Sequence, residues 1–265
     1  MTRFYVLGSG SAGNAAAIAA GGEVLLVDAG FSAKEIARRA AAVGLDLTRL
    51  SALVLTHEHG DHTAGAARLA HSLGLPLLAT PGTWDRLRRR MPKAPFQALA
   101  VMGETTWGPF RIEACPTSHD AAQPVAIAVT TATGHRIGIA YDLGRPTVAV
   151  RYLLREAHAL LIEANHDEIL LRTSRYPPAV QARIAGSGGH LSNRATADLL
   201  AELLHPGLQA VVLAHLSGQC NTPAEARAAV EPVLRRATRP PVLHVADQDV
   251  PLPPIELAPV AEKFG

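Results

Sequence analysis

The sequence is poor in cysteine, in aromatic residues and in long apolar runs. Its two cysteines, Cys115 and Cys220, are too few for a disulfide framework or a thiolate zinc site. Aromatic side chains make up only 4% of the 265 residues, so aliphatic side chains must form most of the core. No apolar run reaches the roughly 18 residues of a membrane-spanning helix, and the first residues lack the features of a signal peptide. We therefore expect a cytoplasmic protein without a membrane partner.

The sequence also has little net charge. With 25 Lys and Arg residues against 23 Asp and Glu residues, the net charge is +2, which is too small to require a polyanionic partner. One dense basic run consists of Arg86, Arg88, Arg89, Arg90 and Lys93. A solvated helix face and a contact with a phosphate backbone both fit this run.

Apolar runs and helical segments are mixed along the whole chain. The runs predict strands at residues 3–7, 24–27, 53–55, 110–112, 125–131, 136–141, 160–162 and 211–213. The helical pattern predicts helices at residues 33–43, with Ser32 as N-cap, and at 61–73, 192–204 and 223–236. A hydrophobic content of 48% supports a sizeable core. We expect a single α/β domain over residues 1–265, with two packed sheets flanked by helices.

Histidine, by contrast, is abundant, with twelve residues. The clearest motif is the His-x-His-x-Asp-His pattern of His57, His59, Asp61 and His62, which follows an apolar strand and precedes a helix. Imidazole and carboxylate groups together suit zinc, iron or manganese. A turn between strand and helix allows four such groups to surround two adjacent ions. The motif therefore predicts a metal site rather than a solvated polar turn.

One motif cannot complete two coordination spheres, so further ligands must come from elsewhere. His119, Asp142 and His215 each follow a strand-like run. A carboxylate at a strand end can bridge two ions with its two oxygens, which suits Asp142. Each of these residues alone would be a weak prediction, but the motif at residues 57–62 makes all three candidate ligands. The sequence thus predicts two divalent metal ions, Zn²⁺ or Mn²⁺.

The ordered set of these ligands resembles the metallo-β-lactamase fold superfamily. The resemblance implies a four-layer αββα sandwich of two mixed sheets flanked by helices, with the metals at one edge. The Gly-His-Leu-Ser and Leu-Ala-His-Leu-Ser segments at 189–192 and 213–217 resemble those of tRNA-3′-processing nucleases. Segments at 7–14, 163–167 and 189–193 are similar to the bacterial YycJ/WalJ-type family. That family is described as metal-dependent exonucleases, with double-stranded DNA ends as the proposed substrate.

The resemblance runs from about residue 3 to residue 235 and leaves out the last thirty. It implies three ligands for each of two ions and one bridging ligand: His57, His59 and His119; Asp61, His62 and His215; and Asp142. The chain departs from the family at two places. Tyr141 stands where Thr is usual, and the Gly-Gln-Cys-Asn run at 218–221 stands where a Glu-Asn-Asn run is usual. Neither departure removes a ligand.

The ligand set suits hydrolysis by a metal-activated hydroxide, with a phosphodiester at a DNA end as the expected substrate. Asp61 is expected to accept the proton of the attacking water. His190 is expected to donate a proton or hydrogen bond to a phosphate oxygen or leaving group. We expect Asp28, Glu163 and Asp167 near the site without being ligands. Seven residues are candidates for binding substrate or supporting the ligands: Ser11, Asn14, His166, Ser192, Asn193, Ser217 and Asn221. A structural role suits His166 nearly as well.

Two other functions use the same residues. A small-molecule hydrolase that acts on a cyclic phosphodiester, a thioester or a lactone would need the same metals, because this fold hosts many reactions. A non-catalytic, metal-bound regulatory protein is less favoured, since it would be expected to have lost ligands and all seven are present. An open basic groove around the metals would indicate a nuclease, and a closed pocket would indicate a small-molecule hydrolase.

Overall fold

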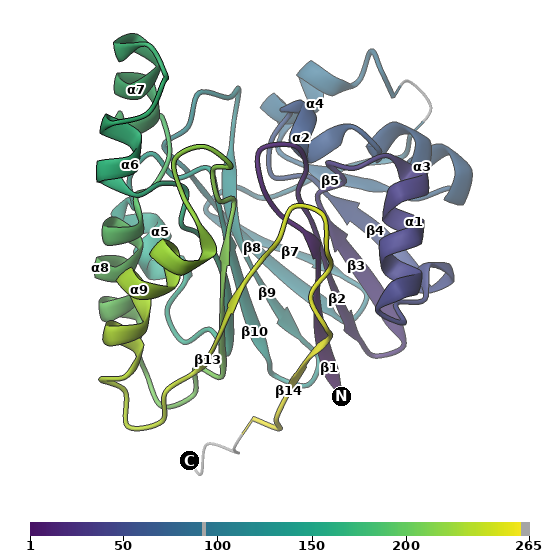
Figure 1. Ribbon diagram of the computed structural model, residues 1–265. Coiled ribbons are helices and arrows are strands. Elements are labelled where there is room, and N and C mark those ends of the chain that lie inside the picture. Colours follow the sequence, from purple (N-terminus) through teal and green to yellow (C-terminus); the bar gives the residue numbers. More distant parts are fainter. Residues whose placement is uncertain (92–93, 261–265) are drawn as a thin grey trace.

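Two sheets packed face to face form the centre of the molecule (Figure 1). The computed structural model describes residues 1–91 and 94–260, so Lys93 of the basic run lies outside the described residues. Within those ranges each sheet has seven strands, and helices cover the outer face of each. This arrangement confirms the predicted αββα sandwich. None of the helices described is long and apolar enough to span a membrane.

The first sheet comes mainly from the N-terminal part of the chain. Its order is β14-β1-β2-β3-β4-β5-β6, parallel from β3 to β6 and antiparallel elsewhere. Its strands are β1 (Thr2–Gly8), β2 (Ala15–Ala20), β3 (Glu23–Val27), β4 (Leu50–Val54), β5 (Leu77–Ala79), β6 (Phe96–Ala98) and β14 (Ile255–Leu257). The helices on this side are α1 (Ala33–Ala42), the 3₁₀ turn η1 (Leu47–Arg49), α2 (Gly60–Thr63), α3 (Ala66–Leu73) and α4 (Pro81–Leu87).

The second sheet repeats the pattern. Its order is β13-β12-β11-β10-β9-β8-β7, parallel from β10 to β13 and antiparallel from β7 to β10. Its strands are β7 (Gly103–Trp107), β8 (Phe110–Pro116), β9 (Val125–Thr131), β10 (Arg136–Ala140), β11 (Ala159–Glu163), β12 (Ala210–Ala214) and β13 (Val242–Val245). Its helices are α5 (Val148–Leu153), α6 (Glu168–Arg172), α7 (Pro178–Ala185), α8 (Asn193–Leu203) and α9 (Pro223–Leu234).

Most strands are buried on both faces, which explains their unbroken apolar runs. In β9, Ile127 and Val129 pack between the sheets, whereas Ala126 and Ala128 pack against the helical layer. On the opposite side, Ile36 of α1 is fully buried in the layer above the first sheet. This two-sided burial fixes the strands, and therefore fixes where their ends place polar side chains.

The prediction of one continuous helix at residues 61–73 is wrong. The chain forms two helices there, α2 and α3, with a break between them. The break lies at Gly65, whose N–H donates to the Ala29 carbonyl at 2.8 Å. A Cβ at this position would lie 2.2 Å from the Phe31 carbonyl oxygen. Close packing against the loop after β3 therefore interrupts the helix. The expected N-cap of α1 is confirmed, since the Ser32 hydroxyl accepts from Glu35 N–H.

The last thirty residues complete both sheets although they lie outside the family resemblance. β13 extends the second sheet beside β12, and β14 pairs with β1 in the first. Between these strands, the Asp247 carbonyl accepts from Ser9 N–H at 3.0 Å, and the Gln248 side chain accepts from Ala12 N–H at 2.8 Å. The C-terminal segment thus supports the loop that follows β1.

Candidate metal centre

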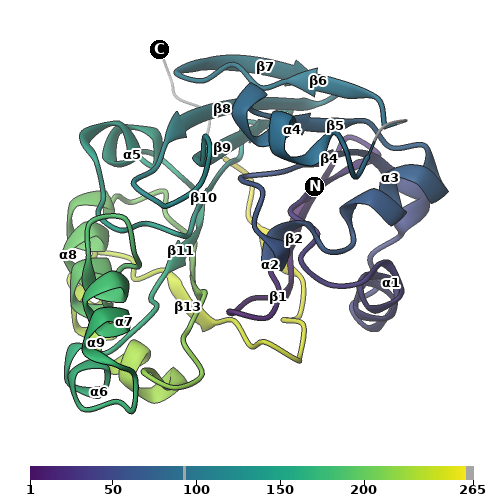
Figure 2. The same cartoon turned by 90° about the horizontal axis from the view of Figure 1, so that it is seen from above.

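Polar side chains gather where the carboxyl ends of β3, β4, β8, β10, β11 and β12 meet at one edge of the sandwich. Figure 2 shows the molecule from this edge, with α2 near its middle. Strands that run in the same direction end together, so residues far apart in sequence become neighbours. Asp28 and His215 directly follow such strands, Asp142 is the second residue after the end of β10, and the three have φ of 57°, 56° and 55°. Left-handed backbone is uncommon for these residue types, and such conformations cluster at functional sites.

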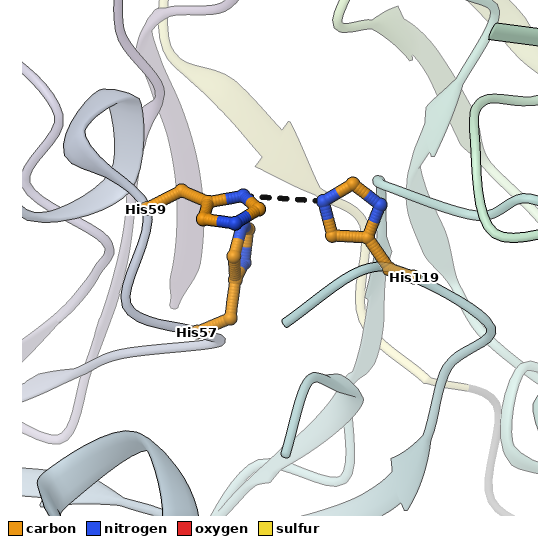
Figure 3. A group of neighbouring side chains, drawn as sticks. All are labelled: His57, His59 and His119. Atoms are coloured by element: carbon orange, nitrogen blue, oxygen red, sulfur yellow. Dashed lines mark hydrogen bonds between the residues drawn. The ribbon is translucent and has the colours of Figure 1, made fainter. Parts of the chain in front are cut away.

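The first group of side chains consists of His57, His59 and His119, whose ring nitrogens lie within 4.8 Å of one another (Figure 3). His119 Nε2 is 3.2 Å from His59 Nδ1. Among the described residues, His57 Nε2 is buried without a hydrogen-bond partner. Burial and the neighbouring His62 lower the pKa of His57 well below its usual range. The neutral imidazole that results is the form that binds metal ions.

The second group consists of Asp61, His62 and His215, which also lie within 4.8 Å of one another. Asp61 Oδ2 is 3.3 Å from His62 Nε2 and 3.3 Å from His215 Nε2. Burial alone would lower the pKa of His215, but the Asp142 carboxylate and the hydrogen bond to Asp61 raise it to about 10. This group therefore holds protons that a bound cation would displace.

Asp142 lies between the two groups and is buried. Its Oδ2 is 2.9 Å from His62 Nε2 and 3.8 Å from His57 Nε2, while its Oδ1 is 3.6 Å from His215 Nε2 and 3.8 Å from His119 Nε2. Burial would raise the pKa of this carboxyl, but His215 and His62 hold it well below its usual range. The structure therefore brings all seven candidate ligands together in buried His and Asp clusters that fit a dinuclear metal site.

A buried carboxylate at the end of β3 orients one of these imidazoles. Asp28 accepts hydrogen bonds from His62 Nδ1 at 2.8 Å, from the N–H and hydroxyl of Thr56 at 2.8 Å each, and from the Tyr141 hydroxyl. The contact on Nδ1 fixes the tautomer of His62 and leaves Nε2 facing Asp61 and Asp142. Asp28 comes from the first sheet and Tyr141 from the second, so their hydrogen bond joins the two halves beneath the site.

We expect Tyr141→Phe to weaken metal binding about tenfold, at the lower end of the loss usual for such outer partners. The variant leaves Asp28 with one donor fewer, so this carboxylate holds His62 less firmly. Competition with a chromophoric chelator measures the metal dissociation constant, and Tyr152→Phe on the exposed face of α5 is a matched control. An unchanged dissociation constant in Tyr141→Phe would show that the hydroxyl plays no part in positioning His62.

Glu163, at the end of β11, supports the other side of the site. Its buried carboxylate accepts from His190 Nδ1 at 2.7 Å, from Leu143 N–H at 2.6 Å and from Leu191 N–H at 3.1 Å. Burial lowers the pKa of His190, but the charge of Glu163 outweighs it and the pKa lies above the usual range. Asp167, also expected near the site, plays a different part. It caps α6 by accepting from the N–H groups at the start of that helix.

The loop after β1 reaches the metal edge through Asn14. This side chain is fully buried, and its Nδ2 lies 3.2 Å from His62 Nε2 and 3.4 Å from Asp61 Oδ2. Its Oδ1 accepts from the Ser9 hydroxyl at 2.7 Å. Sequence analysis missed Ser9, whose Oγ also accepts from His215 N–H at 2.9 Å and so supports a candidate ligand directly. Ser11 is exposed at the tip of this loop.

The other candidate supporting residues make contacts within the chain. Asn193 and Asn221 form a reciprocal pair of amide hydrogen bonds at 2.9 and 2.8 Å, and Asn221 also donates to the Ala164 carbonyl. The Ser192 hydroxyl caps α8, and the Ser217 hydroxyl accepts from Cys220 N–H. These bonds tie together the loops after β11 and β12. Their contact with a substrate stays a prediction.

The fold and this cluster define a metal-dependent hydrolase of the metallo-β-lactamase fold. Residues 24–216 match the family described as "Beta-lactamase superfamily domain". The chain is 32% identical to exodeoxyribonuclease YycJ of Bacillus anthracis over 234 residues, which cover 87% of this chain and 88% of that protein. It is also 32% identical to exodeoxyribonuclease WalJ of Streptococcus pneumoniae over 224 residues, or 83% of each chain. The chain therefore belongs to the YycJ/WalJ family within the metallo-β-lactamase superfamily.

Solved structures agree on the fold. The metallo-β-lactamase fold protein YhfI from Bacillus subtilis aligns with a TM-score of 0.71 and 19% identity, over 95% of this chain and 98% of that one. The short form of human tRNase Z aligns with a TM-score of 0.66 and 17% identity, over 95% and 98% of the two chains. At these identities the likeness concerns the fold alone.

Proposed function

We propose that this protein is a phosphodiesterase that degrades DNA from its ends and requires two divalent metal ions. The observation that carries the proposal is the His190–Glu163 pair, which lies directly against the seven-residue cluster. His190 Nδ1 is 3.4 Å from Asp142 Oδ1 as well as 2.7 Å from Glu163. A histidine acid beside a dinuclear site suits a reaction with a poor alkoxide leaving group, such as the cleavage of a phosphodiester. The similarity to proteins named exodeoxyribonucleases supports DNA as the substrate.

The donor set fits two ions. His57, His59 and His119 would hold one ion, and Asp61, His62 and His215 would hold the other, with Asp142 between them. Imidazole and carboxylate ligands without thiolate suit Zn²⁺ or Mn²⁺. The buried, unpartnered Nε2 of His57 supports the assignment, because a buried polar atom without a partner is costly unless a ligand satisfies it. When bound, two such ions lower the pKa of a shared water and neutralise charge on substrate oxygens.

Asp61 and His190 have separate roles in this proposal. Burial would raise the pKa of Asp61, but hydrogen bonds from His215 and His62 keep it below the usual range, so the carboxylate stays ionised. Its side chain is 24% exposed, against 4% for Asp142, and this exposure suits it to accept a proton from the attacking water. His190 is held through Nδ1, so Nε2 would be the nitrogen that protonates the leaving oxygen.

The exposed arginines of α4 and the turn after it fit a contact with the DNA backbone. Arg86, Arg88, Arg89 and Arg90 all lie on the surface. The start of α4 packs on the loop that carries His119, where the Thr80 hydroxyl donates to the Gln123 carbonyl at 2.8 Å. The start of α4 therefore lies close to the metal edge, and the basic run at the other end of the helix would neutralise phosphate groups of a duplex that extends along it.

A digest with added Zn²⁺ or Mn²⁺ tests the function. We expect the protein to shorten 5′-phosphorylated duplex DNA progressively from its ends, and we expect Asp61→Ala and His190→Ala to cut it much more slowly. Single-stranded DNA and RNA of the same sequence measure substrate preference. If no nucleic acid is cut while bis(p-nitrophenyl) phosphate or a thioester is turned over, the nuclease assignment fails and a small-molecule hydrolase replaces it.

A further inference from the structure

A shallow cavity of about 340 Å³, open to solvent, lies between α6 and α7 at the same end of the sandwich as the metal edge, and Arg172, Pro178 and Ala182 in its walls are exposed. Apolar atoms dominate its walls, and its lining includes His166, Glu168, Leu171, Arg172, Pro178 and Ala182. Figures 1 and 2 show both helices on the outer side of the second sheet, towards the end of the sandwich where the cluster lies.

The cavity lies next to His190, the proposed general acid. His166 lies on the extension of β11 and pairs with the backbone of Ser192, two residues after His190. On the other side, the N–H of His190 donates to the Ile184 carbonyl of α7 at 2.8 Å. The same backbone that positions His190 therefore also forms one end of the cavity. A group bound there would lie next to the bond that His190 acts on.

His166 provides the polar group of the cavity. The residue is 3% exposed, and its Nδ1 is buried without a hydrogen-bond partner within the described part of the chain. Such a buried polar group is costly unless a ligand satisfies it. Burial lowers the pKa of His166, so the imidazole is neutral and carries both a donor and an acceptor. Arg172 adds a cation that suits a phosphate next to the bound group.

We propose that this cavity, defined by His166, Leu171, Arg172 and Ala182, binds the unstacked terminal nucleobase of the DNA strand. The proposal rests on the proposed exonuclease function. A nucleobase is flat and largely apolar, with donors and acceptors at its edge, which matches apolar walls around one imidazole. The end of a duplex frays readily, so the terminal base is the least costly to unstack. Binding it would place the adjacent phosphodiester near His190 and the metal cluster.

A duplex with 2-aminopurine as its terminal base and phosphorothioate linkages at that end tests the proposal. The emission of 2-aminopurine rises when the base unstacks, and the linkages slow cutting during the measurement. We expect emission to rise when metal-loaded protein binds this duplex. We expect no rise with Ala182→Phe, which fills the cavity, and a reduced rise with His166→Leu. Ala179→Phe, an exposed position on the same helix outside the cavity, is the matched control.

Cutting assays give an independent readout. The KM of Ala182→Phe for duplex ends should rise roughly tenfold or more, as expected for losing one base contact, while its turnover of bis(p-nitrophenyl) phosphate should match that of the wild type. Unchanged emission on binding by the wild type, or a normal KM in Ala182→Phe, would overturn the base site and leave the nuclease function standing. A protein that neither binds nor cuts DNA would remove both proposals.

Discussion

Asp142→Asn is expected to lower kcat by at least about a thousandfold, because bound metal ions contribute several kcal/mol to the transition state. The carboxylate lies between the two groups of imidazoles, within 3.8 Å of His57, His62, His119 and His215. Asparagine has nearly the same shape but no charge, so it cannot balance two adjacent cations. Elemental analysis of purified protein should show fewer than two ions per chain.

We expect the substitution at Asp142 to impair metal binding without changing the fold. Its φ of 55° lies in the left-handed region, which asparagine tolerates as well as aspartate does. The backbone should therefore keep its conformation, and circular dichroism of the variant should match the wild type. Asp167→Asn is the matched control, because Asp167 also follows a strand of the second sheet but only caps α6. Two tightly bound ions and normal turnover in Asp142→Asn would rule out its place between the metals.

The convergence of the seven candidate ligands could be predicted from the sequence because it depends on one local motif and on the ends of strands that run in the same direction. Four of the candidate ligands lie within six positions, and their spacing alone indicates a turn that binds metal. His119, Asp142 and His215 follow apolar strands, and the ends of parallel strands lie at a shared edge. The resemblance to a known family then gave the architecture. The broken helix at Gly65 was missed because its cause is a close approach to Phe31, more than thirty residues earlier.

The supporting contacts were harder to predict because they depend on how the two sheets face each other. The hydrogen bond from Tyr141 to Asp28 joins residues 113 positions apart, and no local pattern indicates it. The departure of Tyr141 from the family pattern was visible in the sequence, but its partner was not. Ser9 lies 206 positions before His215, which it supports, and nothing in the sequence of its loop indicates this contact. Gln248 lies in the last thirty residues, which no motif covers.

His190→Ala is expected to lower kcat on DNA by about a hundredfold to ten-thousandfold, the usual contribution of a general acid. Its metal content should stay normal, because all seven candidate ligands remain. The size of the loss should depend on the leaving group. Cutting DNA releases an alkoxide that needs a proton, whereas bis(p-nitrophenyl) phosphate releases a stable p-nitrophenolate that does not. Equal losses on both substrates would indicate that His190 positions the site rather than protonating the leaving oxygen.

The pH dependence of Glu163→Gln is a second test of His190 as the general acid. In the wild type, the charge of Glu163 outweighs burial and holds the pKa of His190 above its usual range, so His190 keeps its proton at higher pH. Activity that needs this proton is present below that pKa and is lost as the pH rises through it. Glutamine removes the charge, and the alkaline limb of the kcat profile on DNA should therefore move to lower pH. His190→Ala should have no such limb, because the group that titrates there is absent. If the alkaline limb keeps its position in both Glu163→Gln and His190→Ala, it reports another titrating group. That result would show that His190 is not the general acid.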